Sequence, residues 1–215
     1  MTKHMKRLAI EKSWPLPRKG TKYLMKQYPG KRKEIAMPLA IVIRDILKVA
    51  STKREVRELL KAGDIIVDGK VCKEEKFPLS IFDNLSIPKI KKNYRITLTE
   101  NGKICAEEIS EKDAHLKICK IIGKKMLKNK VQQINCFDGR NFISKEKMNV
   151  NDSIIFDLKE NKIVKMMPLK NGSDIFIMGG AHIGHKGKIT SVEPKIKVKI
   201  KDNEFETQED KVYVI

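Results

Sequence analysis

The sequence predicts a multidomain α+β protein. We expect a basic arm, a small α-α-β module, a mostly β central domain and a small C-terminal β barrel. Proline-rich basic sequence fills the first sixth of the chain, two helical patterns follow, and short strand patterns separated by turn residues occupy the rest. The four parts are expected at 1–37, 38–88, 89–170 and 171–215.

The composition points to a polyanionic partner. The 215 residues carry a formal net charge of +19, with 46 Lys and Arg against 27 Asp and Glu. Such an excess favours nucleic acid first and an anionic membrane surface second. No uncharged run approaches the roughly 18 residues of a membrane-spanning helix, and the basic N-terminus does not resemble a secretory signal. Four scattered cysteines without a C-x-x-C pair predict free thiols in a reducing cytosol.

The N-terminal segment holds about half of this excess. Its first 33 residues contain eleven Lys and Arg against one Glu, a net charge of +10. Its prolines exclude a long helix, and Trp14, Tyr23 and Tyr28 are interspersed among the cations. We interpret it as an extended basic arm that becomes ordered on a phosphate-rich partner. The alternative is a disordered solubilising tail, against which the aromatic residues argue.

Two helices are expected after the arm. Pro38 suits the first position of a helix, and the largely apolar run Leu39–Val49 follows it. Thr52 and Glu55 have the spacing of a capping box, which predicts a second helix over Thr52–Ala62.

The remaining sequence predicts strands joined by turns. The Asp68-Gly69 pair indicates a tight hairpin, and period-two alternation marks most later segments. Residues 107–121 are ambiguous, with some helical character. The expected strands are Ile65–Val67, Lys70–Val71, Phe77, Ile81–Ile87, Tyr94–Thr99, Gln132–Phe137, Asn141–Ile143, Ser153–Leu158, Ile163–Met167, Ile175–Met178, Lys188–Val192, Lys195–Lys201, Phe205–Thr207 and Val212–Ile215.

The second helix contains the sharpest candidate site. Four cations gather on or beside one face of it: Lys53, Arg54, Arg57 and Lys61. Lys70 lies in the hairpin that follows, and the N-terminal N–H groups of the helix also suit phosphate. The alternative is a solvated face whose cations pair with Glu55 and Glu58.

A glycine-rich loop spans residues 179–187. A phosphate-binding P-loop is disfavoured because His185 stands where Lys is required, and a KH-type G-x-x-G because strands flank it. A dinucleotide fingerprint fails on spacing. We favour glycines that supply positive φ in a turn of a barrel, with an RNA- or protein-facing loop as the other interpretation. No metal site, catalytic triad or paired acid and base can be assigned, and His182 has no Cys or carboxylate nearby in sequence.

Several segments occur in a distinctive order. They are His4, Lys6–Ala9 and Ser13–Pro15, then Ile43–Asp45, Thr52–Glu55 and Val67–Val71, then Lys76–Pro78 and Val131–Asn141, then Ile177–Ile189 and finally Phe205–Ile215. In this order they resemble the archaeal/eukaryotic-type small-subunit ribosomal protein four family along nearly the whole chain. Only Glu11, where a proline is expected, departs from the N-terminal signature. The chain stops without the C-terminal extension of longer eukaryotic-type members, which favours an archaeal-type protein.

The resemblance implies both fold and function. The α-α-β part resembles a compact RNA-binding module shared with several RNA-modifying enzymes, and the C-terminal part resembles the KOW motif of an SH3-like barrel. The implied function is that of a structural constituent of the small ribosomal subunit, which binds rRNA through the arm and the helix-hairpin module and supports translation. The alternatives are an RNA-binding accessory protein, an RNA-modifying enzyme or a KOW-type transcription factor.

The implied partners are small-subunit rRNA and neighbouring ribosomal proteins in the cytoplasm, with no catalysis, cofactor, metal, membrane or obligate homo-oligomer. Aromatic residues at 6% favour recognition of RNA shape over a single-strand stacking platform. The candidate RNA-binding residues are Lys3, Lys6, Arg7, Lys12, Trp14, Arg18, Lys19, Lys22, Lys31, Arg32, Lys33, Arg44, Lys53, Arg54, Arg57, Lys61 and Lys70. The candidate KOW-loop residues are Gly179, Gly180, His182, Gly184, Lys186 and Gly187.

Overall fold

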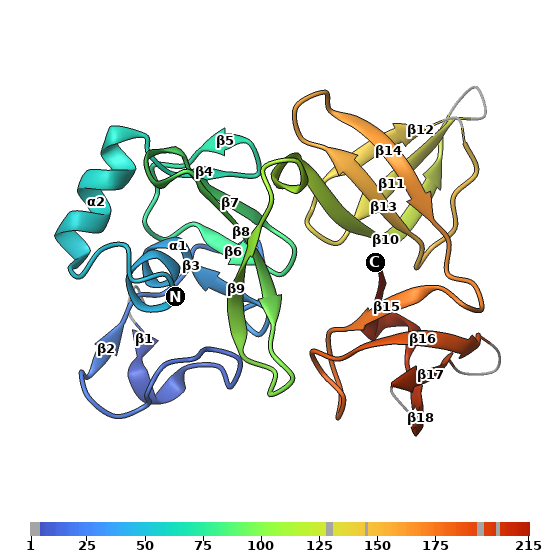
Figure 1. Ribbon diagram of the computed structural model, residues 1–215, viewed down its shortest axis with the longest axis horizontal. Helices are drawn as coiled ribbons and strands as arrows, with labels where there is room; N and C mark the ends of the chain where they lie inside the picture. The colour runs from blue at the N-terminus through green and yellow to red at the C-terminus, as the bar shows by residue number, and fades with distance from the viewer. Residues whose placement is uncertain (1–4, 128–130, 145, 193–195, 201–202) are drawn as a thin grey trace. The chain divides into compact units, whose positions relative to one another are not determined.

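The computed structural model describes residues 5–127, 131–144, 146–192, 196–200 and 203–215. The chain forms two compact units (Figure 1). The first unit comprises the chain up to Leu98 together with Gly102–Lys117, and the second comprises Thr99–Asn101 together with Ile118–Ile215. Among the described residues the α-helices lie only in the first unit. The protein is therefore a mostly β multidomain protein with few helices.

The N-terminal segment folds within the first unit and is not an extended arm. β1 (Met5–Lys6) pairs antiparallel with β2 (Tyr23–Leu24), and β3 (Ala36–Pro38) pairs antiparallel with β6 (Pro78–Ser80). Met37 is fully buried. The expectation that this segment acquires structure only on a polyanion is therefore wrong.

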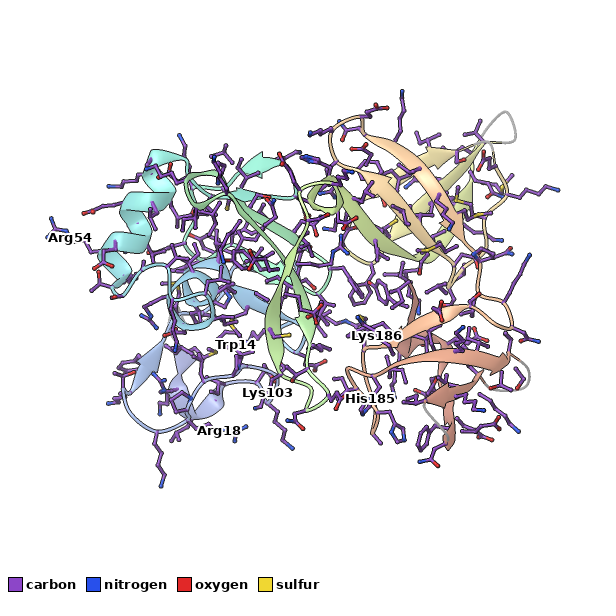
Figure 2. All side chains as sticks on the ribbon, in the orientation of Figure 1. Trp14, Arg18, Arg54, Lys103, His185 and Lys186 are labelled. Atoms are coloured by element: carbon purple, nitrogen blue, oxygen red, sulfur yellow. The ribbon has the colours of Figure 1, made fainter. Side chains whose placement is uncertain are left out.

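Trp14 explains how the segment keeps its shape. Its side chain is 2% exposed, and its indole N–H donates to the carbonyls of Lys33 and Ala36 at 3.2 and 3.0 Å. Burial of a large apolar side chain stabilises the fold by about 2–3 kcal/mol, and the two carbonyls satisfy the buried N–H. Figure 2 shows Trp14 inside the first unit. Trp14 is thus a structural anchor, which corrects the expectation that it contacts RNA.

The first helix is shorter than predicted and changes its winding. α1 (Leu39–Ile41) continues into a π-helical turn, Val42–Ile46, in which the Leu47 N–H donates to the Val42 carbonyl at 2.9 Å. Lys48 then has a φ of 54°, a left-handed conformation that cannot continue the helix. The helix therefore ends before Val49, where the sequence predicts its end.

The second helix begins at its predicted cap. α2 (Lys53–Ala62) follows Thr52, whose hydroxyl accepts from the Glu55 N–H at 3.3 Å, while the Glu55 carboxylate accepts from the Thr52 N–H at 3.4 Å. Gly63 ends the helix with a φ of 82°. Leu60 is 1% exposed and packs the apolar face of α2 into the first unit. The predicted capping box is confirmed.

A five-stranded antiparallel sheet completes the first unit. Its order is β5-β4-β7-β8-β9, with β4 (Ile66–Val67), β5 (Lys70–Val71), β7 (Asn84–Ile87), β8 (Lys92–Leu98) and β9 (Ile104–Ile109). Asp68 and Gly69 form the predicted turn, with φ of 48° and 77°. The domain boundary expected after residue 88 falls inside this sheet, because the first part of β8 pairs with β7, with Asn84 opposite Arg95 and Ile87 opposite Lys92.

Residues 107–121, where the sequence has some helical character, are mainly strand. A short 3-10 turn, Asp113–His115, separates β9 from β10 (Leu116–Met126). Lys117, Cys119 and Ile121 are all buried on one face of β10. Pairing and burial in the sheet override the weak local helical tendency of this segment.

A second five-stranded sheet, formed from β10 to β14, belongs to the second unit. Its order is β12-β11-β10-β13-β14, with β11 (Gln132–Cys136), β12 (Asn141–Ser144), β13 (Ser153–Asp157) and β14 (Lys162–Met167). Ile121, Ile134 and Ile154 form its fully buried core. The Phe142 and Phe156 rings lie 4.5 Å apart on the same side.

The C-terminal sheet has the order β18-β17-β16-β15-β19. It contains β15 (Asp174–Ile177), β16 (Lys186–Ser191), β17 (Ile196–Ile200), β18 (Asn203–Thr207) and β19 (Val212–Val214). Ile175, Ile189 and Val198 form its core. Lys195 and Lys201, at the ends of one predicted strand, lie outside the described residues.

The glycines of the 179–187 loop have two different roles. Gly180 and Gly184 have φ of 100° and 83°, as a turn with positive φ requires. Gly187 is needed for space, because a Cβ there would lie 2.7 Å from the Lys199 carbonyl oxygen.

None of the described helices is long and apolar enough to span a membrane. The four cysteines, all among the described residues, form no disulfide.

Candidate nucleic-acid interface

The exposed face of α2 presents cations on a helix that is fixed at both ends. Arg54 has 88% of its side chain exposed, and it projects from α2 away from the strands of the first unit (Figure 2). Its guanidinium lies 3.3 Å from the Glu58 carboxylate, an exposed pair one helical turn away. Lys61, at the last turn, and Lys70, in the hairpin, are also exposed. These side chains can reach a phosphate backbone without any change in the fold.

Glu75 organises the other two cations of this face. Its carboxylate lies 2.8 Å from the Arg57 guanidinium and 3.2 Å from the Lys53 ammonium. The hydrogen bond from Arg57 and the contact with Lys53 lower the pKa of Glu75, and the same hydrogen bond raises the pKa of Arg57. Lys53 and Arg57 are therefore held side by side on one carboxylate.

The alternative in which Glu55 and Glu58 pair with the cations of this face is only partly correct. Glu58 pairs with Arg54, but Glu55 caps the helix, and bonds from the Ser51 N–H and the Thr52 hydroxyl lower the pKa of Glu55. Glu75 has no local sequence signal, because it lies 18 residues from Arg57. Only the tertiary fold brings the two together.

Most candidate cations of the N-terminal segment face solvent. Those classed as exposed are Lys6, Lys12, Arg18, Lys19, Lys22, Arg32 and Lys33. Figure 2 shows Arg18 at the rim of this segment. Arg7 also serves the fold, since its guanidinium donates to the Pro17 carbonyl at 2.6 Å and to the Thr21 hydroxyl at 2.9 Å. Lys3 lies outside the described residues.

A groove of about 620 Å³ lies between the β1–β2 ribbon, α1 and the start of α2. Five of its lining side chains are cationic: Arg7, Lys26, Arg44, Lys53 and Lys76. None of the described residues that line it is acidic. Arg44 also pairs with its neighbour Asp45 at 2.7 Å, and this hydrogen bond raises the pKa of Arg44. Lys26 and Lys76 were not predicted as site residues, because no periodic pattern relates them to the helices.

A second cluster of charges in the first unit is buried. The Lys117 ammonium, 1% exposed, pairs with Asp68 and lies 2.7 Å from the Asp83 carboxylate. Asp83 is fully buried and also accepts from the Lys31 ammonium at 2.5 Å. Burial alone would raise the pKa of Asp83, but the nearby Lys117 and Lys31 charges outweigh it and lower the pKa. Lys31, a candidate RNA contact, is therefore part of the fold.

The glycine-rich loop forms a smaller hollow in the second unit. Its volume is about 430 Å³, and Gly179, Gly180 and His182 line it with residues of β18. The His182 ring packs on the Phe205 ring, with centroids 3.7 Å apart. Lys186 is exposed at the start of β16 (Figure 2). Among the described residues, no group of three or more His, Cys, Asp or Glu could hold a metal ion.

Comparison with known proteins assigns the chain to a family. An S4 domain model matches residues 37–85, which contain α1, α2 and the hairpin, and a Ribosomal family S4e model matches residues 90–163. The small ribosomal subunit protein eS4 of Archaeoglobus fulgidus is 36% identical over 219 residues, covering 99% of this chain and 92% of that protein. The chain belongs to the S4e family of ribosomal proteins.

Other members of the S4e family agree with this assignment. The small ribosomal subunit protein eS4 of Methanocella arvoryzae is 36% identical and covers 99% of this chain and 93% of that protein. The crystal structure of the 30S ribosomal protein S4e from Thermoplasma acidophilum matches with a TM-score of 0.74 at 28% identity, covering 84% of this chain and 94% of that chain. The resemblance stated from the sequence is confirmed, and the protein is a small-subunit ribosomal protein, not an enzyme.

Proposed function

We propose that the exposed cations of α2, with those of the folded N-terminal segment, bind the phosphate backbone of small-subunit rRNA and so anchor the protein as a structural part of the subunit that supports translation. The observation that carries this proposal is the arrangement on α2. A capped helix within the S4 domain presents Arg54 and Lys61 to solvent and holds Lys53 and Arg57 together on Glu75.

The physics of phosphate binding supports this use of the α2 face. Each neutralised phosphate releases condensed counterions, so the affinity falls with salt by a logarithmic slope of about 0.7–0.9 per contact. Partly exposed ion pairs such as Arg57 with Glu75 contribute only about 1 kcal/mol to stability, so exchanging a carboxylate for a phosphate costs the fold little. Cations already held in place also lose less conformational freedom on binding.

The C-terminal sheet supports a second part of the proposal. We infer that the sheet formed by β15–β19 is an SH3-like barrel and that Gly179–Gly187 is its KOW loop. The five antiparallel strands and the positive φ of Gly180 and Gly184 fit that assignment. The loop would face either rRNA or a neighbouring ribosomal protein, and crosslinking from Lys186 in assembled subunits distinguishes these partners. Nothing in this arrangement calls for an obligate homo-oligomer.

Salt titration tests the proposed role of α2. Binding of small-subunit rRNA transcribed in vitro is measured between about 50 and 200 mM salt. The Arg54→Ala/Lys61→Ala variant should bind more weakly at low salt, with a slope reduced by about 1.4–1.8, equivalent to two lost phosphate contacts. A Lys159→Ala/Lys165→Ala variant removes the same charge from exposed positions of the second unit and should change the slope less. An unchanged slope in the α2 variant would exclude this face, and failure of the wild type to bind rRNA at low salt would reject the whole proposal.

A further inference from the structure

We propose that the groove beside the β1–β2 ribbon seats one unpaired nucleotide of the rRNA, with its phosphate among the groove cations and its base against Tyr23. This assignment rests on the rRNA binding proposed above and adds a single-strand contact to it. The α2 face offers charge but no aromatic ring on which a base could stack.

The charge of the groove selects an anion. Its cations come from separate parts of the chain, since Lys26 follows β2, Arg44 lies in the π-helical turn and Lys76 precedes β6. Arg44 and Lys53 each pair with a carboxylate, those of Asp45 and Glu75, and a phosphate in the hollow would add an attraction to all five groove cations. The Asp45 and Glu75 side chains are not among the groove-lining residues.

Hydrogen bonds hold the Arg7 side chain in place at the proposed anion site. Its guanidinium makes two hydrogen bonds within the N-terminal segment, to Pro17 and Thr21. Those bonds use two of the five N–H donors of an arginine. A guanidinium held in this way binds a phosphate with less loss of side-chain freedom than a mobile lysine does.

The apolar part of the groove selects a base. Leu24 and Ile41 contribute apolar lining, and the Tyr23 side chain at the groove is 49% exposed. The Lys22 ammonium lies 5.4 Å from the centroid of the Tyr23 ring and adds positive charge there. The volume of about 620 Å³ falls within the roughly 300–1,000 Å³ of small-ligand sites.

Paired RNA makes poor use of such a groove. A duplex presents phosphates and shallow groove edges, so the apolar lining and the Tyr23 ring would gain nothing from it. An unpaired nucleotide in a loop or bulge presents a phosphate and a base face together, and bases of this kind stack on tyrosine. The groove therefore fits a single-stranded nucleotide better than a helical segment.

Two RNA probes and two substitutions test the assignment. The probes are small-subunit rRNA transcribed in vitro and a fully paired RNA duplex. Stacking of one base is worth about 1–3 kcal/mol, so Tyr23→Ala should weaken rRNA binding by about 5- to 150-fold. Tyr23→Phe keeps the ring and should bind normally. Neither change should alter duplex binding or the salt slope, because no phosphate contact is lost. Lys26→Gln/Lys76→Gln should instead lower the salt slope for rRNA.

Each outcome has one meaning. Normal rRNA binding by Tyr23→Ala, or equal losses for the Ala and Phe variants, would overturn the nucleotide seat. A loss of the same size on the duplex as well would show that Tyr23 supports the fold or the general surface, and would also overturn the nucleotide seat. If the Arg54→Ala/Lys61→Ala variant still binds weakly while Tyr23→Ala binds normally, only the groove assignment fails. If the wild type does not bind rRNA at low salt, the proposed function fails with it.

Discussion

Two charged clusters of the first unit use the same residue types in opposite ways. On α2, Arg54 and Lys61 stand in solvent, where ion pairs contribute about 0–1 kcal/mol to folding and the charge is available to a polyanion. At the β4–β5 hairpin, Lys117 is buried and pairs with Asp68 and Asp83, so removing one partner leaves an uncompensated charge. The position of a lysine in this fold, more than its presence in a basic sequence, decides whether it serves RNA binding or stability.

The largest expected effect comes from the buried cluster. Lys117→Met should lower the free energy of unfolding by about 3–5 kcal/mol, because Asp68 and Asp83 lose the ammonium between them. Urea denaturation followed by circular dichroism measures it. Lys70→Met, at an exposed position of the nearby hairpin, is the matched control and should change stability by less than about 0.5 kcal/mol. Similar unfolding curves for both variants would remove the contrast between the two clusters.

Lys120 is a buried lysine of the second unit that is hydrogen-bonded to backbone carbonyls instead of carboxylates. Its ammonium is buried and donates to the carbonyls of Glu209 and Val212 at 2.6 and 2.9 Å. Burial lowers the pKa of Lys120 to about 8, more than the nearby Asp210 and Glu209 charges raise it.

This shift predicts a pH dependence of stability. In the unfolded chain Lys120 has an ordinary lysine pKa of about 10.4. Between about pH 8 and pH 10.4, Lys120 is therefore protonated more often in the unfolded chain than in the folded chain. The contribution of Lys120 therefore rises with pH through this window, by at most about 3 kcal/mol. The free energy of unfolding of the wild type, measured from pH 7 to about 10.5, should rise relative to that of Lys120→Met. Parallel pH profiles for the two proteins would contradict the shift.

A smaller effect concerns the start of α2. Thr52→Ala removes the hydroxyl that accepts from the Glu55 N–H and should cost about 1 kcal/mol of unfolding free energy. Thr52→Ser keeps an accepting hydroxyl and should retain most of the stability. Equal losses in the two variants, measured in urea, would show that the capping box does not hold α2 in place.

The smallest effect tests whether the α2 ion pairs compete with RNA. Glu75→Gln removes the carboxylate that Lys53 and Arg57 share, so rRNA binding should tighten about two- to threefold at low salt. The gain should fade as salt screens exposed charges. Glu160→Gln removes the same charge from an exposed pair with Lys162 in the second unit and should have no such effect. Weaker binding by Glu75→Gln would mean that positioning of the two cations outweighs the competition.

Local patterns predicted some elements of this protein closely. The capping box of α2, the Asp68-Gly69 turn and most strands of the second unit follow from interactions within a few residues, so the sequence contains their signal. The N-terminal segment was mispredicted because its stability depends on the burial of Trp14 against carbonyls about 20 residues away. The pairing of β8 with β7 and with β9 was not expected either, because the domain boundary was placed after residue 88, between β7 and β8.

The sequence alone determined the +19 charge, the family and the cations on one face of α2, because composition, motifs and helical spacing are properties of the chain itself. Only the tertiary structure decided which of those cations remain available. Folding placed Lys31 and Lys117 against buried carboxylates, joined Lys53 and Arg57 through Glu75, and gathered the groove cations from separate segments. Electrostatic strength depends on distance and burial, and both are set by contacts between residues that are far apart in the sequence.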